Sequence, residues 1–140
     1  MLSRQDVSSI RRDEEVGREP IWMTKRTSRP SWITSNALLS DFVFFYHKLQ
    51  SYHWYISGHT FFQTHAKLEE YYDDIRPQID EVAETMLMSG YRPVSTMAVF
   101  AKHAKVKDAT EGFVGDVKAV YASILGDFKH LLESVKAFRF

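Results

Sequence analysis

Histidines and carboxylates lie at helical spacing between residues 53 and 84 and could together bind a metal ion. His65 and Glu69 are four residues apart, as are Asp80 and Glu84, so each pair lies on one face of a helix. Imidazole and carboxylate groups without a thiolate suit iron, zinc or manganese, and a mixed set with open positions suits iron that must meet dioxygen or peroxide. The alternative is that acidic residues at this spacing form an ordinary solvated helix face.

The chain from Thr60 onward has the apolar periodicity of one amphipathic helix. Its apolar residues follow one another at intervals of three and four, namely Leu68, Tyr72, Ile75, Ile79, Val82 and Met86. His65 and Glu84 are separated by about 28 Å of helix axis, which is too far for a single ion. Either the helix carries two separate sites, or two copies pack antiparallel and the His65/Glu69 end of one meets the Asp80/Glu84 end of the other.

A helix is also expected over residues 34–57, because its apolar residues repeat at intervals of three and four and Thr34, Ser35 and Asn36 offer capping side chains. His53 falls near the C-terminal end of this helix, before a break at Gly58. The first histidine therefore comes from a different helix than the other candidate ligands. Two helices that converge on one site are the usual construction of metal centres in helical bundles.

The rest of the chain predicts one short helix and one long helix. Gly90 ends the second helix, and a short helix is expected over residues 95–103. A third long helix is expected from about Thr110 to the end, with Phe113 at the start of its apolar core stripe.

Composition indicates one globular domain, because the chain has 140 residues of which 44% are hydrophobic. It has no cysteine, so a disulfide framework and thiolate ligands are excluded, and no apolar run has the length of a membrane span. Its formal net charge is zero, so bulk charge does not indicate a nucleic-acid partner.

Residues 1–33 form a polar N-terminal extension that is expected to be flexible, because it lacks sustained periodicity. Lys25, Arg26 and Arg29 make its one clearly basic piece, and the extension could also be a solvated leader without a function of its own.

The stretch from residue 53 to residue 84 resembles the ferroxidase segment of the Dps family, the DNA-protection-during-starvation proteins, which are ferritin-like mini-ferritins. The matching residues are His53-Trp54, Gly58, Phe61-Phe62, His65, Glu69 and Asp80-Glu81-Val82-Ala83-Glu84. The resemblance implies that His53, His65 and Glu69 are iron ligands of one subunit, and that Asp80 and Glu84 are ligands from its two-fold mate.

The same resemblance places Trp54 beside the site. Three positions depart from the family pattern. Glu69 stands where the family usually has Asp, Thr85 stands where an Arg is common, and Pro77 lies inside the helix, where it removes a backbone hydrogen bond and is expected to kink it.

The fold implied by the resemblance is an all-α, ferritin-like four-helix bundle with a short crossover helix, formed by residues 34–140. A ferritin-like subunit has four long helices, whereas three long helices and one short one are predicted here. The domain is therefore expected to lack most or all of the fourth helix, and loss of that helix leaves an apolar groove.

The function implied by the resemblance is that of a ferroxidase and iron-storage protein. It would oxidise Fe(II) with hydrogen peroxide at two-fold-related intersubunit sites, and thereby protect DNA during oxidative stress. Ferric product would nucleate on acidic residues, for which Glu70, Asp73 and Asp74 are candidates. The family further implies a homododecamer in the cytoplasm or at the nucleoid, with non-specific DNA as a partner. The DNA would be bound by the basic N-terminal residues Lys25, Arg26 and Arg29.

Two other functions stay open. The chain could be a DNA-compacting nucleoid protein whose iron chemistry is secondary, or a truncated bundle that does not assemble. Salt-sensitive DNA retention that depends on residues 1–33 would favour the first of these, and sedimentation as a monomer or an aggregate would favour the second.

Overall fold

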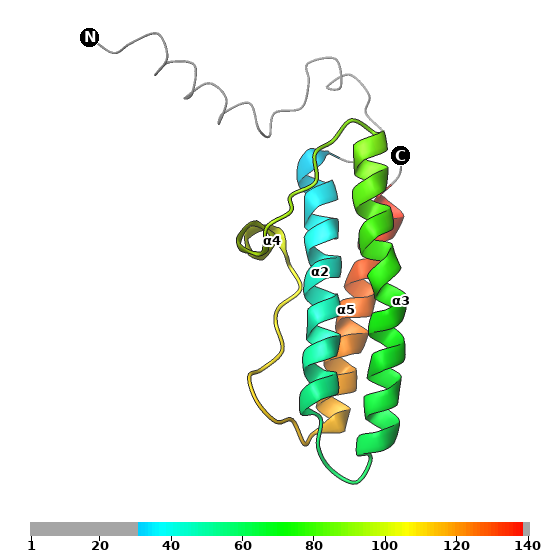
Figure 1. Ribbon diagram of the computed structural model, residues 1–140, viewed down its shortest axis with the longest axis vertical. Helices are drawn as coiled ribbons and strands as arrows, with labels where there is room; N and C mark the ends of the chain where they lie inside the picture. The colour runs from blue at the N-terminus through cyan, green and yellow to red at the C-terminus, as the bar shows by residue number, and fades with distance from the viewer. Residues whose placement is uncertain (1–30, 139–140) are drawn as a thin grey trace, which may run out of the picture.

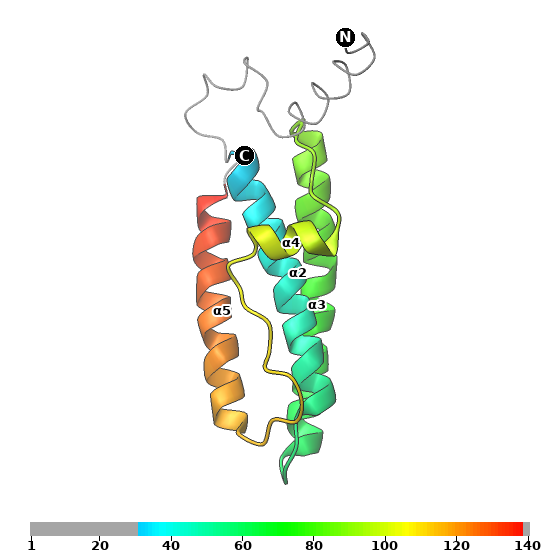
Figure 2. The ribbon, with the colours of Figure 1, turned by 90° about the vertical axis from the view of Figure 1, so that its left-hand side faces the viewer.

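The computed structural model describes residues 31–138, which form three long helices and one short helix. The long helices, α2 (Trp32–Tyr55), α3 (Phe61–Met88) and α5 (Val117–Ala137), lie side by side (Figure 1). The short helix α4 (Met97–His103) crosses the outer side of α2 (Figure 2). None of the helices in the described part is both long and apolar enough to cross a membrane. The ferritin-like arrangement expected from the sequence is confirmed.

Helix α2 is the central element of the bundle. It runs antiparallel to both α3 and α5, so the chain between α3 and α5 must return along the whole length of the bundle (Figures 1 and 2). Phe45 and Leu49 of α2 are fully buried, and Leu68 of α3 and Ile124 of α5 are buried in the same core cluster. The apolar periodicity of the second helix therefore predicted its core face correctly.

Helix α2 begins at Trp32, two residues before the expected start, because Ser31 provides the cap. The Ser31 hydroxyl accepts a hydrogen bond from the backbone N–H of Thr34 at 3.2 Å. Asn36, which was expected to cap the helix, lies inside it. Its side-chain oxygen instead accepts a hydrogen bond from the backbone N–H of Val94 at 2.8 Å, which ties α2 to the segment before α4.

The prediction that the last long helix begins at about Thr110 is wrong, because α5 begins at Val117. Gly112 has a φ of +90°, which interrupts a right-handed helix, and the Asp116 side chain caps α5. Before that cap, the backbone N–H of Val114 donates to the carbonyl of Tyr55 at the end of α2, and its carbonyl accepts from the N–H of Ser57. Phe113, expected in the core, is 80% exposed, and its ring packs against Tyr55.

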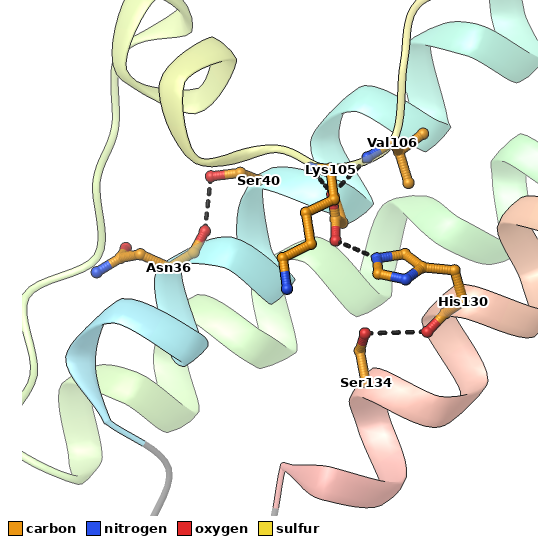
Figure 3. Close-up of polar contacts among 7 residues, drawn as sticks. Asn36, Ser40, Lys105, Val106, His130 and Ser134 are labelled. Carbon is orange, nitrogen blue, oxygen red and sulfur yellow. Dashed lines mark hydrogen bonds and ion pairs between the residues drawn. The ribbon is translucent and has the colours of Figure 1, made fainter.

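Asp41 is a buried carboxylate that joins three elements of the fold, and it is 1% exposed. One of its oxygens accepts backbone hydrogen bonds from Lys105 and Val106 in the segment after α4, at 2.5 and 2.8 Å. The other accepts a hydrogen bond from Nε2 of His130 on α5 at 2.7 Å (Figure 3). A buried carboxylate is tolerated only when such donors compensate its lost hydration, so α2, the returning chain and α5 are fixed together here.

We expect the substitution Asp41→Asn to lower the free energy of unfolding by about 3 kcal/mol, because the amide nitrogen would face donors and leave a buried N–H unsatisfied. Urea unfolding followed by circular dichroism measures the change. The matched control is Glu133→Gln on the exposed face of α5, which should change stability by no more than about 0.5 kcal/mol. Equal effects of the two substitutions would contradict the role given to Asp41.

Candidate metal centre

The turn between α2 and α3 brings His53 and His65 together. Gly58 in this turn has a φ of +109°, a backbone conformation that residues with a Cβ rarely adopt. Nδ1 of His53 lies 2.8 Å from the backbone oxygen of His65, and Nδ1 of His65 lies 2.8 Å from the backbone oxygen of His53. The two rings stack with their centroids 3.6 Å apart and an angle of 20° between their planes.

These reciprocal hydrogen bonds determine which ring nitrogens can bind a metal. A carbonyl oxygen can only accept, so each Nδ1 must carry the proton and donate it. In a neutral imidazole this leaves the lone pair on Nε2. Hydrogen bonding of one ring nitrogen to a backbone carbonyl is the usual way in which proteins orient a metal-binding histidine. Both Nε2 atoms are thus prepared as ligands by the backbone itself.

Glu69 completes the ligand group from the next turn of α3. One potential ligand atom from each of His53, His65 and Glu69 lies within 4.8 Å of the others. His53 is buried, His65 is half-buried and Glu69 is exposed, so the group opens toward solvent at the carboxylate. Two nitrogens and one carboxylate leave coordination positions free for further ligands, and this donor set fits iron. Glu69, although longer than the aspartate usual in the family, reaches the group.

Aromatic rings surround the two histidines. Phe61 stacks on His65 with a centroid distance of 4.9 Å, and Tyr72 packs edge-on against His53 at 5.3 Å. Burial raises the pKa of Tyr72, and the neighbouring Glu69 and Asp73 carboxylates raise it further, so its hydroxyl stays neutral at physiological pH. From the sequence, Tyr72 was predicted only as part of the apolar face of α3. Its position one turn after Glu69, on the side of α3 that faces α2, could have indicated that it lies beside the ligand group.

The structure does not bring all the predicted site residues together in one chain. Asp80 and Glu84 are exposed farther along α3, outside the group formed by His53, His65 and Glu69. Helix α3 runs on through Pro77 between these two sets of residues.

The remaining predicted residues lie at the surface or outside the described part of the chain. Trp54 is 56% exposed, and its ring packs edge-on against His47 rather than His53. The three acidic candidates for iron nucleation, Glu70, Asp73 and Asp74, are exposed on α3, and Glu70 pairs with Lys67 at 2.7 Å. Lys25, Arg26 and Arg29 lie outside the described residues, so their DNA binding stays a prediction.

Comparison with known proteins agrees with this fold. The ferritin-like domain family matches residues 36–138. A DNA protection during starvation protein of Brevibacillus brevis is 34% identical over 104 residues, which cover 74% of this chain and 68% of the relative.

A crystal structure of a DPS protein from Vibrio cholerae, described as a member of the ferritin-like diiron-carboxylate proteins, superposes with a TM-score of 0.71 at 33% identity. The superposition covers 76% of this chain and 66% of the Vibrio cholerae chain. The chain belongs to the Dps family. It spans about two thirds of the length of these Dps relatives.

We expect His53→Ala and His65→Ala each to weaken Fe(II) binding at least tenfold, because each removes one of three prepared ligands. Anaerobic titration calorimetry with Fe(II) measures the affinity. His59→Ala is the matched control, since His59 is an exposed histidine of the same turn that lies outside the ligand group. Unchanged affinity in both site variants would show that Fe(II) binds elsewhere.

Proposed function

We propose that this Dps protein is a ferroxidase that binds Fe(II) as its substrate at His53, His65 and Glu69 and oxidises it with hydrogen peroxide. The observation that carries the proposal is the pair of reciprocal hydrogen bonds that leaves both Nε2 atoms free beside a carboxylate. An anionic carboxylate ligand stabilises the ferric product more than the ferrous substrate, because the product carries one more positive charge. Its presence therefore favours oxidation.

A second copy of the chain would complete the site. Asp80 and Glu84 are exposed on the same long helix that carries His65 and Glu69. If two copies pack with their α3 helices antiparallel about a two-fold axis, each contributes both ends of this helix to two equivalent sites. Asp80 and Glu84 of one copy would then approach the histidines of the other. This arrangement would account for Asp80 and Glu84, which belong to no metal-binding group among residues 31–138.

Iron storage and DNA protection would follow from the same reaction. Relatives of this chain are named DNA protection during starvation proteins. Consuming Fe(II) and peroxide together in a protein site removes the two reactants that would otherwise release hydroxyl radicals near DNA. The exposed carboxylates of Glu70, Asp73 and Asp74 are suited to hold the ferric product, because hard oxygen ligands favour the trivalent ion. A closed homo-oligomer, with twelve subunits as in the family, would enclose that product.

The intersubunit site can be tested by complementation between two inactive variants. His65→Ala and Asp80→Ala should each lose peroxide-driven Fe(II) oxidation when assembled alone. The two variants are then unfolded and assembled together in equal amounts. Each mixed pair regains one intact site, so roughly a quarter of the wild-type rate should return if the pair is isologous. Stopped-flow absorbance of the ferric product measures the rate.

Mixing His65→Ala with Glu69→Ala provides the control, because both residues belong to the same half of the site and no pairing restores it. Wild-type activity with no recovery in the first mixture would contradict a site shared between copies. An inactive wild-type protein would contradict the ferroxidase function itself.

A further inference from the structure

Asp73 and Arg76 are exposed, oppositely charged residues in the middle of α3. Neither side chain forms an ion pair or a hydrogen bond with another residue of the described chain, 31–138. They lie between the half of α3 that carries two of the candidate ligands and the half that carries Asp80 and Glu84. Both charges are therefore available to a second molecule.

The exposed side of α3 is symmetric about the midpoint of residues 73–76. Asp73 and Arg76 are equally distant from this midpoint, and so are Phe62 and Leu87, which lie about 19 Å on either side of it. At about 100° per residue, all four fall within an arc of about 60° around the helix. Phe62 is 80% exposed and Leu87 is 59% exposed, so an apolar side chain projects to solvent at each end.

A two-fold axis through this midpoint would place each residue opposite its counterpart on a second copy. Asp73 of each copy would face Arg76 of the other, which gives two ion pairs beside the axis. Phe62 of each copy would face Leu87 of the other, which gives an apolar contact at both ends. The same axis would bring together the two halves of the proposed metal site, because these halves are also equally distant from it.

The candidate metal ligands alone would not hold two iron-free copies together. Without a metal ion, Glu69 of one copy and Asp80 and Glu84 of the other bring three negative charges to each site, and like charges repel. Two ion pairs beside the axis offset this repulsion, since they attract whether or not iron is bound. The exposed apolar side chains at both ends add buried area to the same contact.

Other alignments of the two helices lack this complementarity. If one copy slides four residues in one direction, Asp73 faces Asp80 of the other copy, and two like charges meet. If it slides four residues in the opposite direction, Leu87 faces the turn at Gly58, beyond the end of the partner helix. Only the alignment about residues 73–76 satisfies both the charges and the apolar ends.

We propose that Asp73 and Arg76 select a second copy of this chain as the partner of α3 and set the alignment of the two helices, an inference that rests on the proposed ferroxidase function. The two copies pair before iron binds, so both shared sites are assembled in the empty protein. Partners are restricted to chains that carry an acid and a base at this same spacing.

Cross-linking of the full, metal-free chain measures the alignment. The chain has no cysteine, and the exposed Phe62 and Leu87 can be replaced without disturbing the core. The double variant Phe62→Cys/Leu87→Cys should be joined into dimers by a short bismaleimide, as seen on a denaturing gel. Phe62→Cys alone is the matched control, because its two copies would lie about 37 Å apart, beyond the reach of the reagent.

Charge exchange in this double-cysteine variant tests the two residues themselves. Arg76→Asp leaves only acids beside the axis and Asp73→Arg leaves only bases, so each alone should cross-link at least tenfold more slowly. Cross-linking should return when the two are mixed, because every acid then faces a base of the other copy. Asp74→Arg is the matched control, since it changes the charge equally about 100° further around the helix. It should cross-link as fast as the double-cysteine parent.

The outcomes separate this inference from the ferroxidase proposal. Absence of cross-linking in the parent, or no effect of either charge change, overturns the inference. So does a mixture that stays unlinked although both variants have the circular dichroism of the wild type. Peroxide-driven Fe(II) oxidation by wild-type protein is measured separately. Oxidation without cross-linking overturns the alignment alone, whereas cross-linking without oxidation overturns the ferroxidase proposal and supports the pairing surface.

Discussion

The candidate metal centre depends on the mutual hydrogen bonding of His53 and His65, in which each ring nitrogen Nδ1 donates to the other residue's backbone carbonyl. This arrangement requires the end of α2 and the start of α3 to lie side by side, which the turn at Gly58 permits. It fixes both ring orientations and both tautomers through backbone carbonyl groups rather than through other side chains. The orientation of the two candidate ligands is therefore a property of the backbone geometry as much as of the histidines.

Helix α2 holds that geometry in place because the rest of the fold is attached to it. Asp41 joins it to the returning chain and to α5, and Lys48 forms a buried ion pair with Asp127 of α5 at 2.7 Å. In these hydrogen bonds and this ion pair each buried charge has a partner. They therefore specify how α5 and the crossover lie on α2 without leaving a buried charge uncompensated. The candidate ligand His53 lies on the same helix, so these contacts also set its position.

Much of the fold could be predicted from the sequence, as could one half of the proposed site, the group of His53, His65 and Glu69. Regular periodicity located α3 and its core face, and the spacing of His65 and Glu69 placed both on one helical surface. The start of α5 could not be predicted in this way, because the apolar periodicity continues through Phe113 while backbone pairing of Val114 with the end of α2 competes with helix formation. Periodicity carries no information about such long-range hydrogen bonds.

The contacts of Asp41 were likewise beyond sequence reasoning, and those of Tyr72 were indicated only by its position one turn after Glu69. An apolar seam does not distinguish a tyrosine that packs in the core from one that touches a ligand, and a single acid inside a helix does not reveal its distant donors. In the proposed site, Asp80 and Glu84 of a second copy would approach the histidines, and neither spacing nor the structure of one chain tests that arrangement. This shared site is the central claim of the account.

Anomalous X-ray diffraction at the iron edge, from crystals of the assembled protein loaded anaerobically with Fe(II), tests that claim most directly. The account predicts one strong peak within coordination distance of Nε2 of His53, Nε2 of His65 and the Glu69 carboxylate, with Asp80 and Glu84 of a second copy facing the same ion. A peak bound only by exposed acids of α3, with both histidines unliganded, would contradict it.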